Sequence, residues 1–456
     1  TPKMNPFEYF KRTRYVQYLS VFIASLVSSS CSMYMSWSSP VIPQLTFFSS
    51  AEISWIVSFV SLGSIPGSIL GGLLLNKIGR KKTILLTTVF LFLPWVAIAL
   101  STDAVVFMIA RFLGGIGMAF ASITVPVYIG EIADKDIRGR LALVYTLLAT
   151  SGTVLTLSVG PYISYKWLSV LGAAVPLVCA LALLPFPESP YYLLQVDKRV
   201  AARESLTRLA AKTENCDATE IRFLQIEKII ADQKRERKSV KDIIWNKDFR
   251  KSMLLVLGMK TIHQLSGANG IKAYMETIMR LSQTDIPPQL SSVIFGSSQI
   301  PSVLISALLI DRLGRKPLMI VSTLGCAVGL ICEGVYFYLD YLGNIDLSPV
   351  NWLPTFGLTL FHIMVSFGVS SLPYVLYGEL FITSAKGLAG AILIIYSGCL
   401  TFVVMKSFGP AVEALGIYVV FWGFAGACLL GTFFGVFVLP ETKGKALSEI
   451  QDLINK

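Results

Sequence analysis

Residues of opposite charge recur in the same order in the two halves of the sequence, and such residues can form ion pairs with one another. Each of them stands at or near the end of a long apolar run. Basic residues alone are enough to orient a chain across a membrane, so the repeated acidic residues indicate that pairing is part of their role. The first half carries Arg80, Glu131, Arg138 and Glu188, and the second half carries Asp311, Arg312, Arg315, Glu379, Lys386 and Glu441.

The apolar runs are the elements that must position these charges. Of the 456 residues, 54% are hydrophobic and only 15% are charged, whereas about a quarter of the residues of a soluble domain are charged. A membrane-spanning helix uses about 20 apolar residues, so we expect an all-α membrane protein with twelve transmembrane helices. The runs lie at 15–37, 53–75, 83–101, 105–130, 141–163, 168–187, 252–279, 290–310, 317–339, 352–378, 387–410 and 416–439.

Charged stretches divide the chain into two halves of six spans each. We expect six-helix bundles at 1–187 and 251–439, a hydrophilic segment between them at 188–250, and a tail at 440–456. The segment 188–250 holds 14 basic and 11 acidic residues, so it is expected to lie in water. Its apolar residues recur at about helical spacing, which predicts short amphipathic helices against the bundle. These residues are Ile221, Leu224, Ile229 and Ile230.

The net charge of +11 reports the orientation of the chain rather than an anionic partner. If both termini are cytoplasmic, 33 of the 39 basic residues lie on the cytoplasmic side, as the positive-inside rule requires. We therefore expect a multi-pass protein of the cell membrane, embedded in the lipid bilayer with both termini in the cytoplasm. No nucleic-acid partner is expected, and the functional unit is expected to be a monomer.

A parallel repeat of two six-span halves is typical of secondary transporters, in which substrate binds between the halves near the middle of the membrane. The repeated charges then have a mechanical interpretation. We expect them to pair across the cytoplasmic seam when the cavity faces outward and to separate when it faces inward. The alternative is that they only orient the chain.

Seven sets of motifs in the correct order resemble the sugar porter family of the major facilitator superfamily over essentially the whole chain. They are the loops GRKK and DRLGRK, Arg111 in RFLGGIGMAF, PVYIGEIADKDIRGRL, PESPYYLL, HQLSGANGIKAY, YGELF and PETKGK. The stretches WSSP and SWIVSFVSLGSIPG are most similar to the arthropod facilitated trehalose and hexose transporters and to the short-loop animal glucose transporters. The resemblance implies the major facilitator fold, and we expect Arg111 to belong to the network of gating charges.

The resemblance also implies how a sugar is held. In the family, amides and hydroxyls from spans 5, 7, 8, 10 and 11 bind the sugar, because a neutral polyol needs donors and acceptors rather than charge. Gln264 and Asn269 match the family pattern QLSGxN, and Gln299 stands where the family usually has asparagine. Gly267 and Gly270 can let this span bend, which suits a gate. The alternative for the two span 7 amides is that they only join helices within the membrane.

Several positions depart from the family pattern, so glucose selectivity is not implied. They are His263 for a second glutamine, Thr146 for the span 5 glutamine, Ser366 for an acid and Tyr374 for a tryptophan in span 10, and Ser397 for the span 11 asparagine. Lys272 replaces an aromatic residue, with Glu276 four positions later. An ion pair between these two and a direct contact of Lys272 with substrate both remain open.

These observations favour facilitated diffusion of a neutral sugar, trehalose or a hexose such as glucose, by alternating access. The first span, 15–39, contains no acidic residue, whereas proton-driven relatives commonly carry a carboxylate there. His263 and His362 leave proton coupling open, because histidine titrates near neutral pH. A carrier of another polyol or glycoside, and a sugar receptor that does not transport, also remain open.

Enzymatic chemistry, a cofactor and a metal site are not expected. Ser189 lies in PESP rather than in a G-x-S-x-G turn, and the glycines at 114, 115 and 117 lie inside an apolar run, where a dinucleotide-binding turn does not form. The seven cysteines form no CxxC pattern and no cluster with histidine, so neither a zinc site nor a disulfide framework is indicated.

Overall fold

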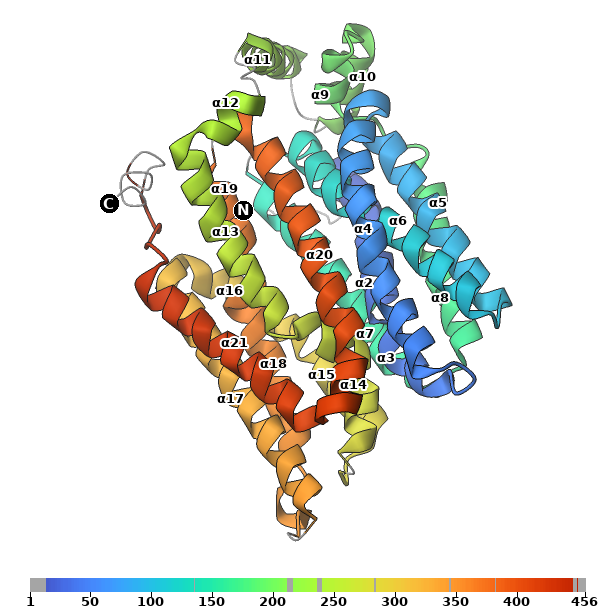
Figure 1. Cartoon of the computed structure of the whole chain (residues 1–456). Helices are drawn as coiled ribbons and strands as arrows, with labels where there is room; N and C mark the ends of the chain where they lie inside the picture. Colours follow the sequence, from blue (N-terminus) through green and yellow to red (C-terminus); the bar gives the residue numbers. More distant parts are fainter. Residues whose placement is uncertain are drawn as a thin grey trace, which may run out of the picture.

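The computed structural model describes residues 14–134, 136–210, 216–235, 240–282, 284–343, 346–381, 383–445 and 449. Within these ranges the regular structure is helical. Two groups of long helices run side by side, and the short helices α9–α12 lie at one end of the molecule (Figure 1). We call this end the linker side and the other end the opposite side.

The first group contains the helices of residues 15–183, and their starts have local causes. Helix α4 begins with a capping box, in which the Ser49 hydroxyl accepts the Glu52 N–H and the Glu52 carboxylate accepts the Ser49 N–H. Asp103 caps α6 by accepting the N–H of Val105. The helices are α2 (Tyr15–Ser36), α3 (Ser38–Val41), α4 (Ser50–Ile78), α5 (Arg80–Leu100), α6 (Ala104–Ile132), α7 (Arg138–Val159) and α8 (Tyr165–Leu183).

Helices α4 and α6 pack backbone against backbone. A Cβ atom on Gly63 would lie 2.0 Å from the carbonyl oxygen of Phe112, and one on Gly115 would lie 2.1 Å from that of Val60. No other residue fits at these positions without moving the helices apart. Glycine therefore joins the middle of the first group tightly, as small residues do in membrane helix pairs.

The second group contains the helices of residues 247–437, and several of its spans are interrupted. A π-helical turn at Val365–Val369 separates α18 from α19 within one predicted span. The helices are α13 (Lys247–Leu265), α14 (Ala268–Leu281), α15 (Pro288–Ser297), α16 (Gln299–Leu313), α17 (Arg315–Leu342), α18 (Leu353–Met364), α19 (Leu372–Leu380), α20 (Thr383–Leu415) and α21 (Ile417–Phe437).

Two of the twelve predicted spans divide into two helices that are each too short or too polar to count as a membrane-crossing segment. In the described part of the chain, ten helical segments are long and apolar enough to cross a membrane, and the runs 252–279 and 290–310 account for the other two. The first divides into α13 and α14 at Gly267, whose φ of +76° ends the helix. The second divides into α15 and α16, where Pro301 has no N–H to donate to the carbonyl of Ser297.

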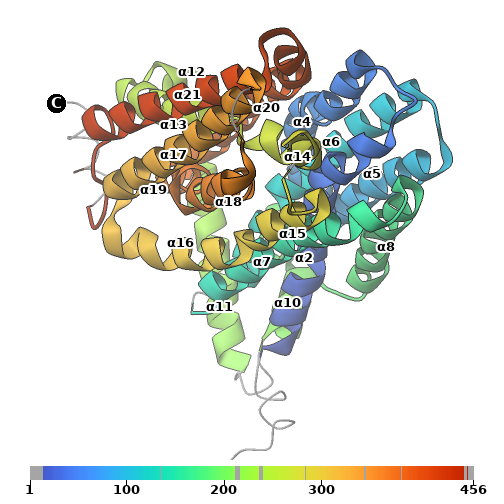
Figure 2. The same ribbon diagram turned by 90° about the horizontal axis from the view of Figure 1, so that it is seen from below.

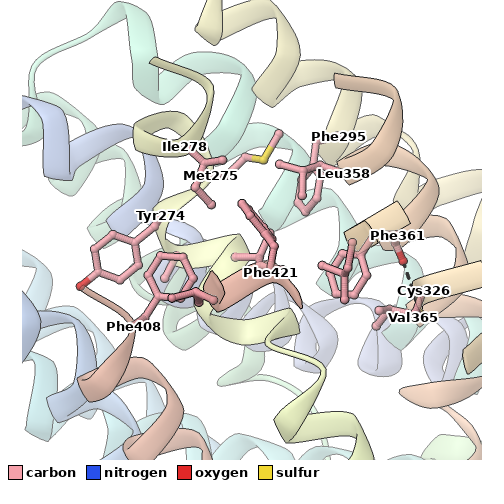
Figure 3. Close-up of a cluster of buried hydrophobic side chains, with 14 of the residues drawn as sticks. Tyr274, Met275, Ile278, Phe295, Cys326, Leu358, Phe361, Val365, Phe408 and Phe421 are labelled. Carbon is pink, nitrogen blue, oxygen red and sulfur yellow. Dashed lines mark hydrogen bonds between the residues drawn. The ribbon is translucent and has the colours of Figure 1, made fainter. Parts of the chain in front are cut away.

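A large apolar core on the opposite side fixes α14 against its neighbours. Figure 3 shows Tyr274, Met275 and Ile278 of α14 facing aromatic residues of other helices in the second group. Tyr274 stacks on Phe408 of α20 with ring centroids 4.9 Å apart. Residues from Ile271 to Met279 belong to this core, so almost the whole of α14 packs against its neighbours.

The predicted amphipathic helices of 188–250 are present, but of the four apolar residues expected to face the bundle only Ile230 is buried. The segment forms α9 (Pro190–Gln195), α10 (Arg199–Leu209), α11 (Cys216–Arg235) and α12 (Val240–Trp245). Phe223, Ile226 and Ile230 of α11 are buried against α9 and α10. Ile221, Leu224 and Ile229, which the sequence suggested for this role, are exposed. Both stripes have helical spacing, and only the docking of α11 on α10 selects between them.

Candidate substrate cavity and charge networks

A cavity of about 310 Å³ lies where the two groups of helices meet. Small-molecule sites in proteins occupy about 300–1,000 Å³, so it can hold a small solute. The first group contributes only small or apolar side chains, whereas the second contributes all the amide and basic groups. The lining residues are Met35, Val60, Ser61, Ser64, Met118, Ala119 and Ser122 from the first group, and Lys260, His263, Gln264, Asn269, Tyr374, Leu393, Ile394, Ser397, Gly398 and Thr401 from the second.

Gln264 connects three helices at the wall of this cavity. Its Nε2 donates to Ser397 Oγ of α20 at 2.7 Å, and its Oε1 accepts from Asn269 Nδ2 of α14 at 2.8 Å. Residues five apart in a continuous helix do not share a face. The break at Gly267 is therefore what brings the two amides together, and the result is an array of donors and acceptors suited to sugar hydroxyls.

Lys260 also lines the cavity, and the sequence analysis overlooked it. Its ammonium Nζ donates to the Tyr374 hydroxyl at 3.2 Å and lies 4.6 Å from the centre of that ring. Lys260 is only 3% exposed, whereas Tyr374 is 57% exposed. The available signal was its position one helical turn before Gln264, on the same face of α13.

Five of the eight predicted substrate residues line the cavity, namely His263, Gln264, Asn269, Tyr374 and Ser397. The other three do not. The Thr146 hydroxyl donates to the carbonyl of Ala142, and the Ser366 hydroxyl donates to that of His362. Gln299 opens α16, and its Oε1 is buried without a hydrogen-bond partner in the part of the chain that the structure describes.

The anticipated ion pair between Lys272 and Glu276 does not form. Glu276 instead pairs with Arg280, one turn further along α14, at 2.8 Å. Lys272 donates from Nζ to Thr153 Oγ1 of α7 at 2.9 Å. It therefore joins the two groups of helices, and it does not line the cavity.

Glu188 caps the start of α5 from a distant part of the chain. Its Oε1 accepts the N–H groups of Arg80 and Lys81, each at 3.0 Å. The cap residue Gly79 has a φ of +99° and has no side chain to offer. A Cβ atom there would lie 2.5 Å from Glu188 Oε2. Glycine thus makes room for a carboxylate at the positive end of the helix dipole.

Arg80 continues this network to α6. Its Nη2 and Nε donate to the two carboxylate oxygens of Glu131 at 2.7 and 2.8 Å. The Ser189 hydroxyl donates to the same carboxylate. We call Arg80, Glu131 and Glu188 the first charge network; it joins α5, α6 and the residues before α9.

The second group repeats this arrangement with Arg315, Glu379 and Glu441, the second charge network. Glu441 accepts the N–H groups of Arg315 and Lys316 at 3.0 and 3.1 Å, beside Gly314 with its φ of +91°. Arg315 Nη2 donates to Glu379 at 2.6 Å. Although partial burial opposes ionisation, the N–H groups of Arg315, Lys443 and Lys316 lower the pKa of Glu441.

Both networks join helices of a single group, so the pairs formed by Arg80 and Arg315 do not cross the seam in this conformation. The remaining predicted gating residues make backbone contacts. Arg138 donates to the carbonyl of Ala133, Lys386 donates to that of Gly378, and the carbonyl of Arg312 accepts from Lys443. The side chain of Asp311 lies outside the described residues.

Arg111 lies apart from the other predicted gating charges. It is buried on α6, about two turns from the start of that helix on the opposite side. Its guanidinium donates to the carbonyl of Tyr34 at 2.5 Å and to Ser38 Oγ at 3.1 Å, and it lies 4.7 Å from the centre of the Tyr34 ring. Arg111 therefore holds the junction of α2 and α3, not a seam between the two groups.

Hydrogen bonds between the two groups gather on the opposite side, where Figure 2 shows α14 and α15 at the junction. Lys406 Nζ of α20 donates to Ser54 Oγ of α4 at 3.1 Å and lies 4.1 Å from the centre of the Trp55 ring. The backbone N–H of Glu276 donates to Ser39 Oγ at 3.2 Å. With the bond from Lys272, these contacts close the opposite end of the seam.

Comparison with known proteins supports the assignment of the fold. The chain matches the family described as "Sugar (and other) transporter" over residues 8–454. It is 31% identical over 440 residues to the facilitated trehalose transporter Tret1 of Bombyx mori, which covers 96% of this chain and 86% of the relative. It is 30% identical over 454 residues to Tret1 of Polypedilum vanderplanki, which covers 99% of this chain and 89% of the relative.

The fold is similar to that of the xylose transporter XylE from E. coli in its inward-open conformation, with a TM-score of 0.76 and 21% identity over 96% of this chain and 98% of that chain. The expected resemblance and the expected twelve-helix major facilitator fold are thereby confirmed. The chain belongs to the sugar (and other) transporter family, and it is accordingly a multi-pass membrane transporter and not an enzyme.

Proposed function

We propose that this chain carries a sugar, trehalose or a hexose such as glucose, across the plasma membrane by facilitated diffusion. The observation that carries the proposal is the hydrogen-bonded set Gln264, Asn269 and Ser397 at the wall of a cavity between the two groups of helices. Amides and hydroxyls in a fixed array match the hydroxyls of a sugar. The relatives named as facilitated trehalose transporters support the same substrate class.

Five cavity residues are proposed to form the sugar site, with different roles. Gln264 and Asn269 supply both donors and acceptors, and Ser397 holds Gln264 in place. The exposed ring of Tyr374 offers a face on which a sugar can stack. His263 Nδ1 is buried without a hydrogen-bond partner in the described part of the chain, so it can bond to a substrate hydroxyl.

The linker side is proposed to face the cytoplasm, because most basic residues lie there. Contacts between the two groups gather on the opposite side, which supports a conformation open to the cytoplasm. The groups, 1–187 and 251–439, would move as two bodies joined by 188–250 and followed by the tail 440–456. A single chain supplies both walls of the cavity, which supports a monomer as the functional unit.

Alternating access in this scheme depends on both ends of the seam. Opening to the outside breaks the bonds of Lys406 to Ser54 and of Lys272 to Thr153. The two charge networks keep each group intact while their surfaces approach each other at the cytoplasmic end. The residues of the networks are proposed to meet across the seam only in that outward-facing state.

Binding is tested by counterflow of labelled trehalose and glucose in proteoliposomes. Gln264→Ala should abolish saturable exchange, because it removes the group that binds both Ser397 and Asn269. Gln299→Ala is the matched control, since it makes the same change at a glutamine that does not line the cavity. Equal exchange by both variants would refute the proposed site, and binding without exchange by the unaltered protein would identify a receptor.

Energy coupling is tested with the same proteoliposomes. Helix α2 has no acidic residue, and His362 is buried against Phe295, with ring centroids 4.0 Å apart, outside the cavity. Uptake should therefore be insensitive to an imposed pH gradient and to an uncoupler. Strong stimulation by inward-directed protons would replace the uniport mechanism with symport.

A further inference from the structure

Lys260 places a positive charge inside the cavity without a carboxylate to balance it. The residues that line the cavity, all of them within the described part of the chain, include no aspartate or glutamate. Lys260 is 3% exposed and forms no ion pair with any described residue. A buried charge is costly unless it is paired, and the empty cavity offers Lys260 no negatively charged group.

The only polar partner of Lys260 among the described residues is the Tyr374 hydroxyl, at 3.2 Å. An ammonium has three donors, so two of them remain free for a ligand. The face of the Tyr374 ring partly compensates the charge, but it supplies no negative charge. Lys260 is thus available on the same wall as Gln264.

Other nearby groups add donors rather than negative charge. His263 lies three positions after Lys260 on the same helix and also faces the cavity. Glu276, the acidic residue of the run 252–279, is already paired with Arg280 on the opposite side. Glu333 of α17 is buried against Gly357 of α18 and does not line the cavity. No described acid therefore competes for Lys260.

We propose that the cavity binds an anionic group at Lys260 together with the sugar ring. The group is either an acidic substituent of the carbohydrate itself, such as a carboxylate, or a small free anion such as chloride that enters beside a neutral sugar. In both cases the ligand neutralises Lys260, which lowers the cost of enclosing that charge when the carrier passes through its occluded state. This inference rests on the proposed function, and it specifies the charge of what the site accepts.

The test compares D-glucose with D-glucuronate, which differ only by a carboxylate in place of the terminal hydroxymethyl group. Both compete against labelled glucose in counterflow, in chloride and in methanesulfonate. If the anion is a substituent, glucuronate should compete at least ten times better than glucose with the unaltered protein. If it is free, removing chloride should weaken glucose exchange at least tenfold.

Substitutions connect either effect to Lys260. Lys260→Gln should abolish the effect, and Lys260→Arg, which keeps the charge, should retain it. Lys166→Gln is the control, because it makes the same change at an exposed lysine of α8 that does not line the cavity. Thermal unfolding of each purified variant confirms that it is folded.

Two failures are distinguishable. Sugar exchange that depends on neither chloride nor the carboxylate, or an anion effect that persists in Lys260→Gln, would overturn this inference and leave the proposed function intact. Absence of any sugar exchange by the unaltered protein would remove the proposed function, and this inference with it.

Discussion

The two halves of the molecule share their charge networks but differ in the continuity of their helices. In the first half, α4, α5, α6 and α7 run unbroken between their ends. In the second half, the chain breaks at Gly267, again between α15 and α16, and once more at the π-helical turn Val365–Val369. The common framework therefore lies at the helix ends, and the halves diverge in the middle of the membrane.

This difference coincides with the division of labour at the cavity. The second half supplies Gln264, Asn269 and Lys260, and the first half supplies small and apolar side chains. Interrupted helices release backbone groups and redirect side chains where a cavity can accept them. We infer that the continuous half acts as a fixed wall and the interrupted half as the adjustable one.

The largest test of this comparison is the removal of Arg80. Its side chain is 4% exposed and that of Glu131 is 15% exposed, against 11% and 26% for Arg315 and Glu379. Breaking a buried ion pair costs about 3–5 kcal/mol. Arg80→Gln should therefore lower the thermal midpoint of the purified protein strongly, and Arg315→Gln should lower it less. Equal losses would show that the two networks are equivalent in stability as well as in shape.

The next test addresses the continuous half. Gly115→Ala would place a methyl group 2.1 Å from the carbonyl oxygen of Val60 and should cost about 1–3 kcal/mol by overpacking. Gly423→Ala on α21 is the control, since nothing lies within 4 Å of its Cβ position. Thermal unfolding in detergent measures both. A tolerated Gly115→Ala would mean that α4 and α6 separate easily, contrary to a fixed wall.

The sequence identified the residues of the two charge networks, but it did not predict the contacts that these residues make. The members of the charge networks could be identified because they repeat, as Arg80 and Arg315 do. The contacts within the networks could not be predicted, since Glu188 caps a helix that begins 108 positions earlier in the chain. Arg111 was assigned to the gating charges from its motif, and its contact with Tyr34 could not be predicted because it depends on how α2 packs on α6.

The residues of the cavity could be predicted only in part, because their contacts also depend on the geometry of the helices. Gln264 and Asn269 could be found from their motif, but their mutual hydrogen bond requires the break at Gly267. Thr146 and Ser366 were carried over from aligned positions, and both instead bond to carbonyls of their own helical segments. Lys260 lies one helical turn before Gln264 and therefore on the same face of α13. A search for charged residues at the ends of the apolar runs does not find it, because it lies inside a run.

Substitution of Gly267, at the break between α13 and α14, is expected to have a smaller effect on stability and a specific effect on transport. Gly267 has a φ of +76°, and a Cβ atom there would lie 2.3 Å from the ring of Phe424. A non-glycine residue in the left-handed region costs about 1–2 kcal/mol. Gly267→Ala should disturb the hydrogen bond between Gln264 and Asn269. Counterflow should therefore fall even when it is measured for equal amounts of folded protein.

Gly426→Ala on α21 is the matched control for this position, because no atom lies within 4 Å of its Cβ position. Rates of exchange are compared at equal amounts of folded protein. Unchanged exchange by Gly267→Ala would show that the break is not needed to position the amides, and the proposed adjustable wall would lose its main support.

The smallest expected effect concerns the pH dependence of the second charge network. The pKa of Glu441 is lowered from its ordinary value of 4.5 by the backbone N–H groups that bind its carboxylate, even though burial opposes them. A group whose pKa is lower in the folded state stabilises the protein fully above its unfolded pKa and loses that contribution as the pH falls through the folded pKa. The thermal midpoint of the unaltered protein should therefore approach that of Glu441→Gln as the pH is lowered from about 5 toward 3.

Glu413→Gln, at an exposed acid on the opposite side, is the control for the loss of one carboxylate. A gap between the unaltered protein and Glu441→Gln that stays constant over this range would mean that the carboxylate does not stabilise the start of α17 through its charge, and that the two networks share their geometry without sharing its energetic basis.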